Sequence, residues 1–292
     1  MELGRQPTRH VTRLRSLFMG HSLPQVFGCS HKPYALMTAG NMWADRQVLN
    51  GLMDNPYQDW RVCFRGGKIR DEVRIRLCAE FPMLSEVYNN PLWEILRAVA
   101  TQQPTDSLVE HFKLDGHGIS GFSNQDMERL CGVPNWQRFG LLLAVLFSSS
   151  WKWQLHSLWL QRNFSSYFEI ASLREPLCFV STELYEMLSS FLAKRQDIVI
   201  NNWPETAEAL HQSIKFRSYL FCLMREMRWV KDVDDRGYEL LWKLMDRHWA
   251  RELKMLLIDS TQGRRSPCST ALLQSARRAL DYQRRTQLQF VA

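Results

Sequence analysis

The side chains best suited to chemistry in this sequence are arginines near its two ends. Residues 1–16 hold four arginines against one glutamate, and residues 263–292 hold six against one aspartate, so these segments carry net charges of +3 and +5. The whole chain carries +7, which leaves a near-neutral body between them. A guanidinium offers a planar fork of donors that matches carboxylate and phosphate oxygens. We therefore expect ten residues to bind an acidic partner: Arg5, Arg9, Arg13, Arg15, Arg264, Arg265, Arg277, Arg278, Arg284 and Arg285.

The arginines near the C-terminus recur at a spacing of seven, in the pairs 277–278 and 284–285. A helix expected from about residue 271 to 285 places both pairs on one side. An ordinary solvated helix face explains this pattern. The sharper interpretation is that the outer row receives an acidic protein segment or the anionic surface of a membrane. Non-specific binding of nucleic-acid phosphates is a further alternative.

Histidines and carboxylates offer little for catalysis. His211 lies three residues after Glu208, and His248 lies two residues after Asp246, but neither pair belongs to a ligand set or a triad. The Gly-rich stretch at 114–122 lacks the spacing of a phosphate-binding loop. We therefore expect no catalytic residue, no metal site and no cofactor, and predict a protein that is not an enzyme.

Seven cysteines are scattered singly, without a CxxC spacing, and their number is odd. This pattern argues against a disulfide framework and indicates a reducing compartment, hence the cytoplasm. The longest apolar run, Phe139 to Phe147, is far shorter than the roughly 20 residues that span a bilayer. We expect a buried helix there and no transmembrane segment.

Hydrophobic periodicity predicts an all-α protein, an irregular multi-helix domain of about ten helices with at most one short β element. The stretch RVCFRGG, at 61–67, is the best candidate for a short strand or turn. Ser123 and Asp126 resemble a capping box and predict a helix start. The segment ELLWKLMDRHW, at 239–249, places Trp242, Met245 and Trp249 on one helical stripe, which is typical of a core-facing surface.

The segment from Ser123 to Leu146 superficially resembles a helix-turn-helix. A recognition helix exposes polar and basic residues at its start. Here Gln137 and Arg138 are followed only by apolar residues, so the second helix is expected to be buried.

Several short motifs resemble the DotM/TrbA family of type IVB secretion and IncI-type conjugation systems. Near the start they are Arg13, Gly20, Cys29-Ser30 and the YAL of 34–36, followed by Asp45-Arg46; near the end they are ELLWKLMDR, Gly263-Arg264-Arg265-Ser266 and Arg278-Ala279-Leu280. The similarity covers about 150 residues. Arg13 stands at a basic position of the family, whereas Gly28 stands where the family has an arginine that binds acidic signals.

The resemblance implies an all-α cytoplasmic domain of a coupling complex, peripheral at the inner membrane, which receives substrates for transfer. The family usually carries transmembrane helices ahead of this domain, so this chain would be a soluble relative or lack that start. We expect three regions: a basic helical start at 1–54, a helical insertion or subdomain at 55–181, and a helical half with a basic last helix at 182–292. The predicted function is a non-enzymatic adaptor or structural component of a conjugation or type IVB secretion apparatus. Its predicted partners are coupling-complex proteins or acidic protein segments. The alternative is a nucleic-acid-binding accessory protein of a plasmid or other mobile element.

Overall fold

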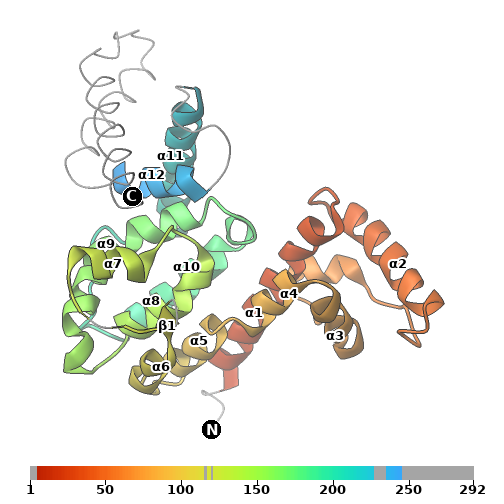
Figure 1. Cartoon of the computed structure of the whole chain (residues 1–292), viewed down its shortest axis with the longest axis horizontal. Helices are drawn as coiled ribbons and strands as arrows, with labels where there is room; N and C mark the ends of the chain where they lie inside the picture. The colour runs from red at the N-terminus through yellow and green to blue at the C-terminus, as the bar shows by residue number, and fades with distance from the viewer. Residues whose placement is uncertain (1–4, 115–116, 120, 227–234, 245–292) are drawn as a thin grey trace, which may run out of the picture. The chain divides into compact units, whose positions relative to one another are not determined.

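The structure is a computed structural model that describes residues 5–114, 117–119, 121–226 and 235–244. The described residues up to Trp242 belong to one compact unit, Met1–Trp242. Its first part contains α1 (Arg5–Phe27), α2 (Pro33–Leu49), η1 (Trp60–Arg65), α3 (Asp71–Glu80), α4 (Pro82–Asn89), α5 (Leu92–Ala100) and α6 (Asp106–His111) (Figure 1). After β1 (Lys113–Leu114) and β2 (His117–Gly118) come α7 (Asn124–Cys131), η2 (Trp136–Arg138), α8 (Phe139–Leu146), η3 (Trp151–Trp153), α9 (Gln154–Ala171), η4 (Leu177–Phe179), α10 (Ser181–Leu192), α11 (Ala207–Glu226) and α12 (Asp235–Leu244).

The predicted fold class is confirmed, because the described residues form twelve α-helices joined by short 3-10 helices and loops. The strands β1 and β2 are two residues each and pair antiparallel, with Lys113 opposite Gly118. They form a small hairpin within the Gly-rich stretch and contribute no sheet to the core.

The stretch RVCFRGG is helical, so the expectation of a strand or turn there is corrected. Residues Trp60–Arg65 form the 3-10 helix η1. The Asp59 side chain accepts a hydrogen bond from the backbone N–H of Arg61 and so caps the start. Gly66, at φ 75°, ends the helix in the left-handed region that glycine tolerates best. Capping at both ends of η1 thus outweighs the strand preference of Val62 and Phe64.

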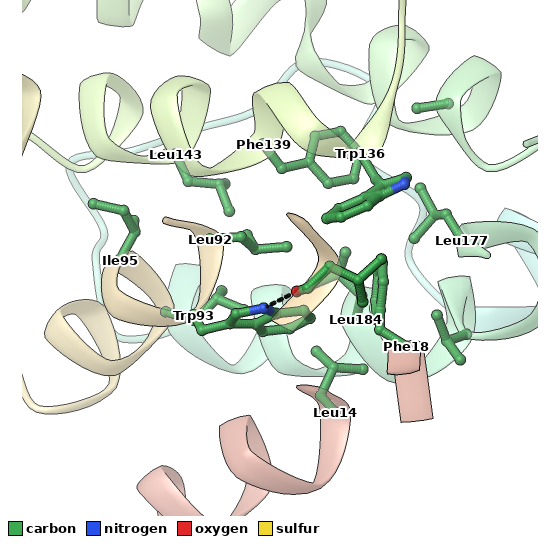
Figure 2. Close-up of a cluster of buried hydrophobic side chains, with 14 of the residues drawn as sticks. Leu14, Phe18, Leu92, Trp93, Ile95, Trp136, Phe139, Leu143, Leu177 and Leu184 are labelled. Carbon is green, nitrogen blue, oxygen red and sulfur yellow. Dashed lines mark hydrogen bonds between the residues drawn. The ribbon is translucent and has the colours of Figure 1, made fainter. Parts of the chain in front are cut away.

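Helix α1 packs against α2, η1, α4, α5 and α10. Val11, Leu14 and Phe18 are buried and recur at helical spacing, so one face of α1 lies in the core. Figure 2 shows Leu14 and Phe18 beside Trp93 of α5. The Phe18 ring meets Trp93 and Trp136 edge to face, with centroids 5.1 and 5.4 Å apart.

The Trp93 indole combines burial with a satisfied hydrogen bond. Its Nε1 donates to the Val87 carbonyl at 2.7 Å, the dashed bond of Figure 2. A buried indole N–H without a partner costs about 1–3 kcal/mol. This bond therefore fixes α5 against the end of α4.

Helix α8 is buried at all eight of its residues, as its uniformly apolar sequence predicts. Phe139 stacks with Phe168 of α9 at 5.5 Å. Tyr167, also on α9, donates to the Cys131 carbonyl at 2.8 Å, which links α9 to the end of α7. The capping box predicted at the start of α7 is present, with Ser123 and Asp126 bonded reciprocally.

Helix α9 also joins α11 through a buried ion pair. The Glu169 carboxylate accepts hydrogen bonds from Arg217 at 2.7 and 2.8 Å, with side-chain exposures of 7% and 12%.

On α12, Leu241 is buried and Trp242 packs against Tyr167 and Trp159. The predicted core-facing stripe is therefore present at its first position, whereas Met245 and Trp249 lie outside the described residues. None of the described helices combines the length and the apolar character needed to cross a bilayer.

Candidate functional site: a cationic cleft beside α1

The arginines predicted near the N-terminus lie on one helix. Arg5 begins α1, and its side chain lies outside the described ones. Arg9 and Arg13 are exposed, whereas Arg15 is half-buried. The six other predicted site residues lie outside the described residues: Arg264, Arg265, Arg277, Arg278, Arg284 and Arg285.

Arg9, Arg13 and Arg15 are brought together in a cleft of about 400 Å³. The opposite walls come from the segment after η1, from α3 and from α4. These walls add Lys68 and Arg74, so five cationic side chains line the cleft. The lining contains one acidic residue, Asp71. We call this feature the cationic cleft.

Asp71 pairs with the two cationic side chains on the wall opposite α1, Lys68 and Arg74. Its carboxylate accepts from Lys68 Nζ at 2.9 Å and lies 3.4 Å from Arg74. The Lys68 hydrogen bond and charge lower the pKa of Asp71, so it is ionised at neutral pH. Neither Arg9 nor Arg13 has an ion-pair partner among the residues that the structure describes. The α1 wall of the cleft thus presents two guanidinium groups that form no ion pair with another described residue.

Two guanidinium groups lie against the Tyr88 ring. Arg15 Cζ lies 4.2 Å and Arg74 Cζ 4.3 Å from its centroid. Both distances are within the range of cation–π attraction. Arg74 Nε is buried without a hydrogen-bond partner among the described residues. Tyr88 therefore holds two cations close together at the wall of the cleft.

The lowered pKa of Arg15 shows that its charged form is disfavoured in this position. Burial lowers it, and the neighbouring charges of Arg97 and Arg74 lower it further, while Tyr88 raises it. Arginine still stays charged at any physiological pH. An anion bound in the cleft would relieve the repulsion between these guanidinium groups.

The backbone after η1 passes close to the Arg13 side chain at the edge of the cleft. Gly66 lies against it, and a Cβ added to Gly66 would lie 2.9 Å from Arg13 Cγ. Arg13 also borders a second hollow, of about 510 Å³, between α1 and α10. There Glu183 and Glu186 of α10 offset the cationic side chains, and the floor is apolar. Arg13 thus stands between a cationic and a mixed-charge surface.

Lys68, Arg74 and Tyr88 were not among the residues predicted from the sequence. They belong to the region expected to be an insertion, where KIRDEVRIR mixes four basic residues with two acidic ones, for a net charge of +2. The only available signal was the recurrence of basic residues at 68, 70, 74 and 76. Packing of α4 against α1, and of α3 against α4, brings two of these residues, Lys68 and Arg74, to the cleft.

The histidine–carboxylate pairs and the cysteines form no metal-binding cluster among the described residues. His211 is exposed, and Glu208 accepts a hydrogen bond from Gln212, not from His211. His248 and Asp246 lie outside the described residues. Within the described ranges, no group of three or more histidine, cysteine or acidic side chains is arranged to hold a metal ion. Six cysteines are free thiols there: Cys29, Cys63, Cys78, Cys131, Cys178 and Cys222.

No family model, curated protein or solved structure matches this chain. The resemblance to the DotM/TrbA family therefore rests on its sequence motifs alone.

Proposed function

We propose that the protein is a non-enzymatic adaptor that binds acidic segments of partner proteins in the cationic cleft. The observation that carries this proposal is the convergence of Arg9, Arg13 and Arg15 with Lys68 and Arg74 around a single acidic residue. Carboxylates match guanidinium forks in shape and charge. A segment with several glutamates or aspartates would satisfy more of these donors than a single anion.

The setting of this activity is a bacterial conjugation or type IVB secretion apparatus, with coupling-complex proteins as partners. The motif resemblance to the DotM/TrbA family supports this assignment, and Arg13, at a matching basic position, lines the cleft. Cytoplasmic action at the inner membrane belongs to the same proposal.

Nucleic-acid binding is less well supported by the described residues. The second helix of the helix-turn-helix-like segment begins as η2, where Gln137 is exposed and Arg138 half-buried. It continues as α8, which is wholly buried and offers no side chains to a DNA groove. Tyr88, the aromatic residue at the cleft, is occupied by two guanidinium groups and is not free to stack on a base.

The test is binding of a fluorescently labelled, glutamate-rich peptide, followed by anisotropy. The matched peptide has glutamine in place of every glutamate. We expect Arg13→Gln to weaken binding of the acidic peptide about tenfold, because it removes a charge-assisted contact. Arg162→Gln, at an exposed site on α9, is the control and should leave the affinity unchanged.

Two outcomes would reject the proposal. One is equal binding of the glutamate and glutamine peptides. The other is tight binding of single- or double-stranded DNA in gel shifts without any acidic-peptide binding, which would favour the nucleic-acid alternative.

A further inference from the structure

Helices α1 and α10 contact each other and border the second hollow, of about 510 Å³, which we call the α1–α10 groove. Its α1 wall consists of residues at positions i, i+3, i+4 and i+7, namely His10, Arg13, Leu14 and Leu17. Its α10 wall continues the same spacing over about three turns, with Glu183, Glu186, Met187, Ser190, Phe191 and Lys194. Each helix thus turns one complete stripe of side chains toward the groove, as two members of a three-helix arrangement do.

The floor of the groove is apolar. Leu14 and Leu17 of α1 and Phe191 of α10 are buried there, whereas Met187 is half-buried. A methionine side chain is flexible and polarisable, so it adapts to the groups that pack on it. The Ser190 hydroxyl donates to the Met187 carbonyl at 2.7 Å, within its own helix. Met187 is therefore the part of the floor that an occupant would contact most.

The two rims of the groove carry opposite charges that form no ion pair with each other. Arg13 is exposed on the α1 rim, and Glu183 and Glu186 are exposed on the α10 rim. Their charges are not paired with any other residue in the described part of the chain. Lys194 adds an exposed cation at the end of the α10 rim. Opposite charges on either side of an apolar floor match a body whose two flanks carry the complementary signs.

We propose that the α1–α10 groove binds an amphipathic helix of a partner protein, with its apolar residues on the floor, a basic flank along Glu183 and Glu186, and an acidic flank along Arg13. The α10 wall is about 16 Å long, so the bound helix has about three turns. A helix fits better than an extended segment because both walls repeat with the pitch of a helix. The inference does not depend on the proposed function, since Arg13 is the one residue that lines both the groove and the cationic cleft.

A designed peptide of about 14 residues is the probe, which we call the bipolar peptide. It carries leucines on one helical stripe, lysines along one flank, glutamates along the other, a hydrocarbon staple on the outer face and a fluorescent label. Its matched isomer has the same composition with the leucines distributed around the helix. In anisotropy titrations of the full chain at neutral pH, the bipolar peptide should bind at least tenfold more tightly than the isomer, because only its leucines can reach the floor together. Equal affinities would overturn the proposal.

A double variant tests the charged rim. Glu183→Gln with Glu186→Gln removes its negative charge without changing its volume. We expect this variant to bind the bipolar peptide about fivefold more weakly, because two charge pairs at exposed sites are lost. Glu94→Gln with Glu128→Gln, at exposed sites on α5 and α7, removes the same charge elsewhere and should bind like the wild type. Equal affinities in all three proteins would contradict the charge complementarity on which the proposal rests.

Arg9 distinguishes the groove from the cationic cleft, because it lines the cleft and not the groove. Arg9→Gln should therefore leave the affinity for the bipolar peptide unchanged. If Arg9→Gln weakened binding and the variant of Glu183 and Glu186 did not, the acidic flank of the peptide would lie in the cationic cleft, and the proposal would be wrong.

Photo-cross-linking locates the peptide directly. A benzophenone in place of the central leucine should cross-link to residues 183–194, and to Met187 in particular, as mapped by mass spectrometry. Cross-links confined to other segments would overturn the proposal.

Sedimentation of the free protein tests a second copy of this chain as the occupant. A dimer that dissociates on Glu183→Gln with Glu186→Gln would place that second copy in the groove and overturn the proposal of a partner helix. A monomer that binds the bipolar peptide with one-to-one stoichiometry supports it.

Discussion

Tyr88 shows how one side chain can organise the charges around it. Arg15 Cζ and Arg74 Cζ lie 4.2 and 4.3 Å from the centroid of its ring, although the two cations repel each other. The attraction of each guanidinium for the ring is about 0.5–1 kcal/mol at a partly exposed site. The ring thus positions two cations at the wall of the cleft.

We expect Tyr88→Leu to weaken acidic-peptide binding about threefold, because the two guanidinium groups lose the ring that positions them. Tyr88→Phe keeps the aromatic face and should bind like the wild type. Anisotropy titrations of the three proteins at neutral pH make the comparison. Equal affinities for all three would show that the ring does not position the arginines.

Glu169 and Arg217 form a buried charge pair outside the lining of the cationic cleft. We expect Arg217→Met to lower the free energy of unfolding by about 3–5 kcal/mol, because it leaves the Glu169 carboxylate buried without its cation. Urea denaturation measures this change. The double variant Glu169→Leu with Arg217→Met should recover most of the loss, since both members of the pair are then removed together. A single variant as stable as the wild type would contradict this account.

At the scale of elements, the seam between α1 and η1 depends on close backbone contact. We expect Gly20→Ala to lower the free energy of unfolding by about 1–3 kcal/mol, because its Cβ would collide with the Cys63 carbonyl, a backbone atom that cannot rotate away. Gly118→Ala is the control, since nothing lies within 4 Å of an added Cβ there. Thermal denaturation of both variants checks this, and equal midpoints would argue against a tight seam.

The elements also show which features were predictable from sequence. Helix α8 was predictable because every residue is apolar, and α7 because Ser123 and Asp126 cap its start through local bonds. The 3-10 helix η1 was not, because its form depends on the Asp59 cap and on packing against Gly20.

The same distinction applies to the candidate site. Arg9, Arg13 and Arg15 were identified because they stand in a segment with little acid. Lys68 and Arg74 were not, because neighbouring acids mask them in the sequence, and only tertiary packing separates these charges.

At the scale of the whole molecule, a basic segment at residues 1–16 precedes a near-neutral body. The described part of this segment lies on α1 and lines the cationic cleft. Binding of an acidic segment there would be driven largely by charges at or near the surface, which dissolved salt screens. The affinity should therefore depend on ionic strength in proportion to the number of cleft cations that contact the partner.

The salt dependence of acidic-peptide binding tests this account most directly, measured between about 50 and 300 mM salt on the wild type and on the double variant Arg9→Gln with Arg13→Gln. We predict that the wild-type affinity falls steeply with salt, and that the double variant binds more weakly with a clearly shallower dependence. Identical affinities and identical salt dependence in the two proteins would contradict the assignment of the cationic cleft as the binding site.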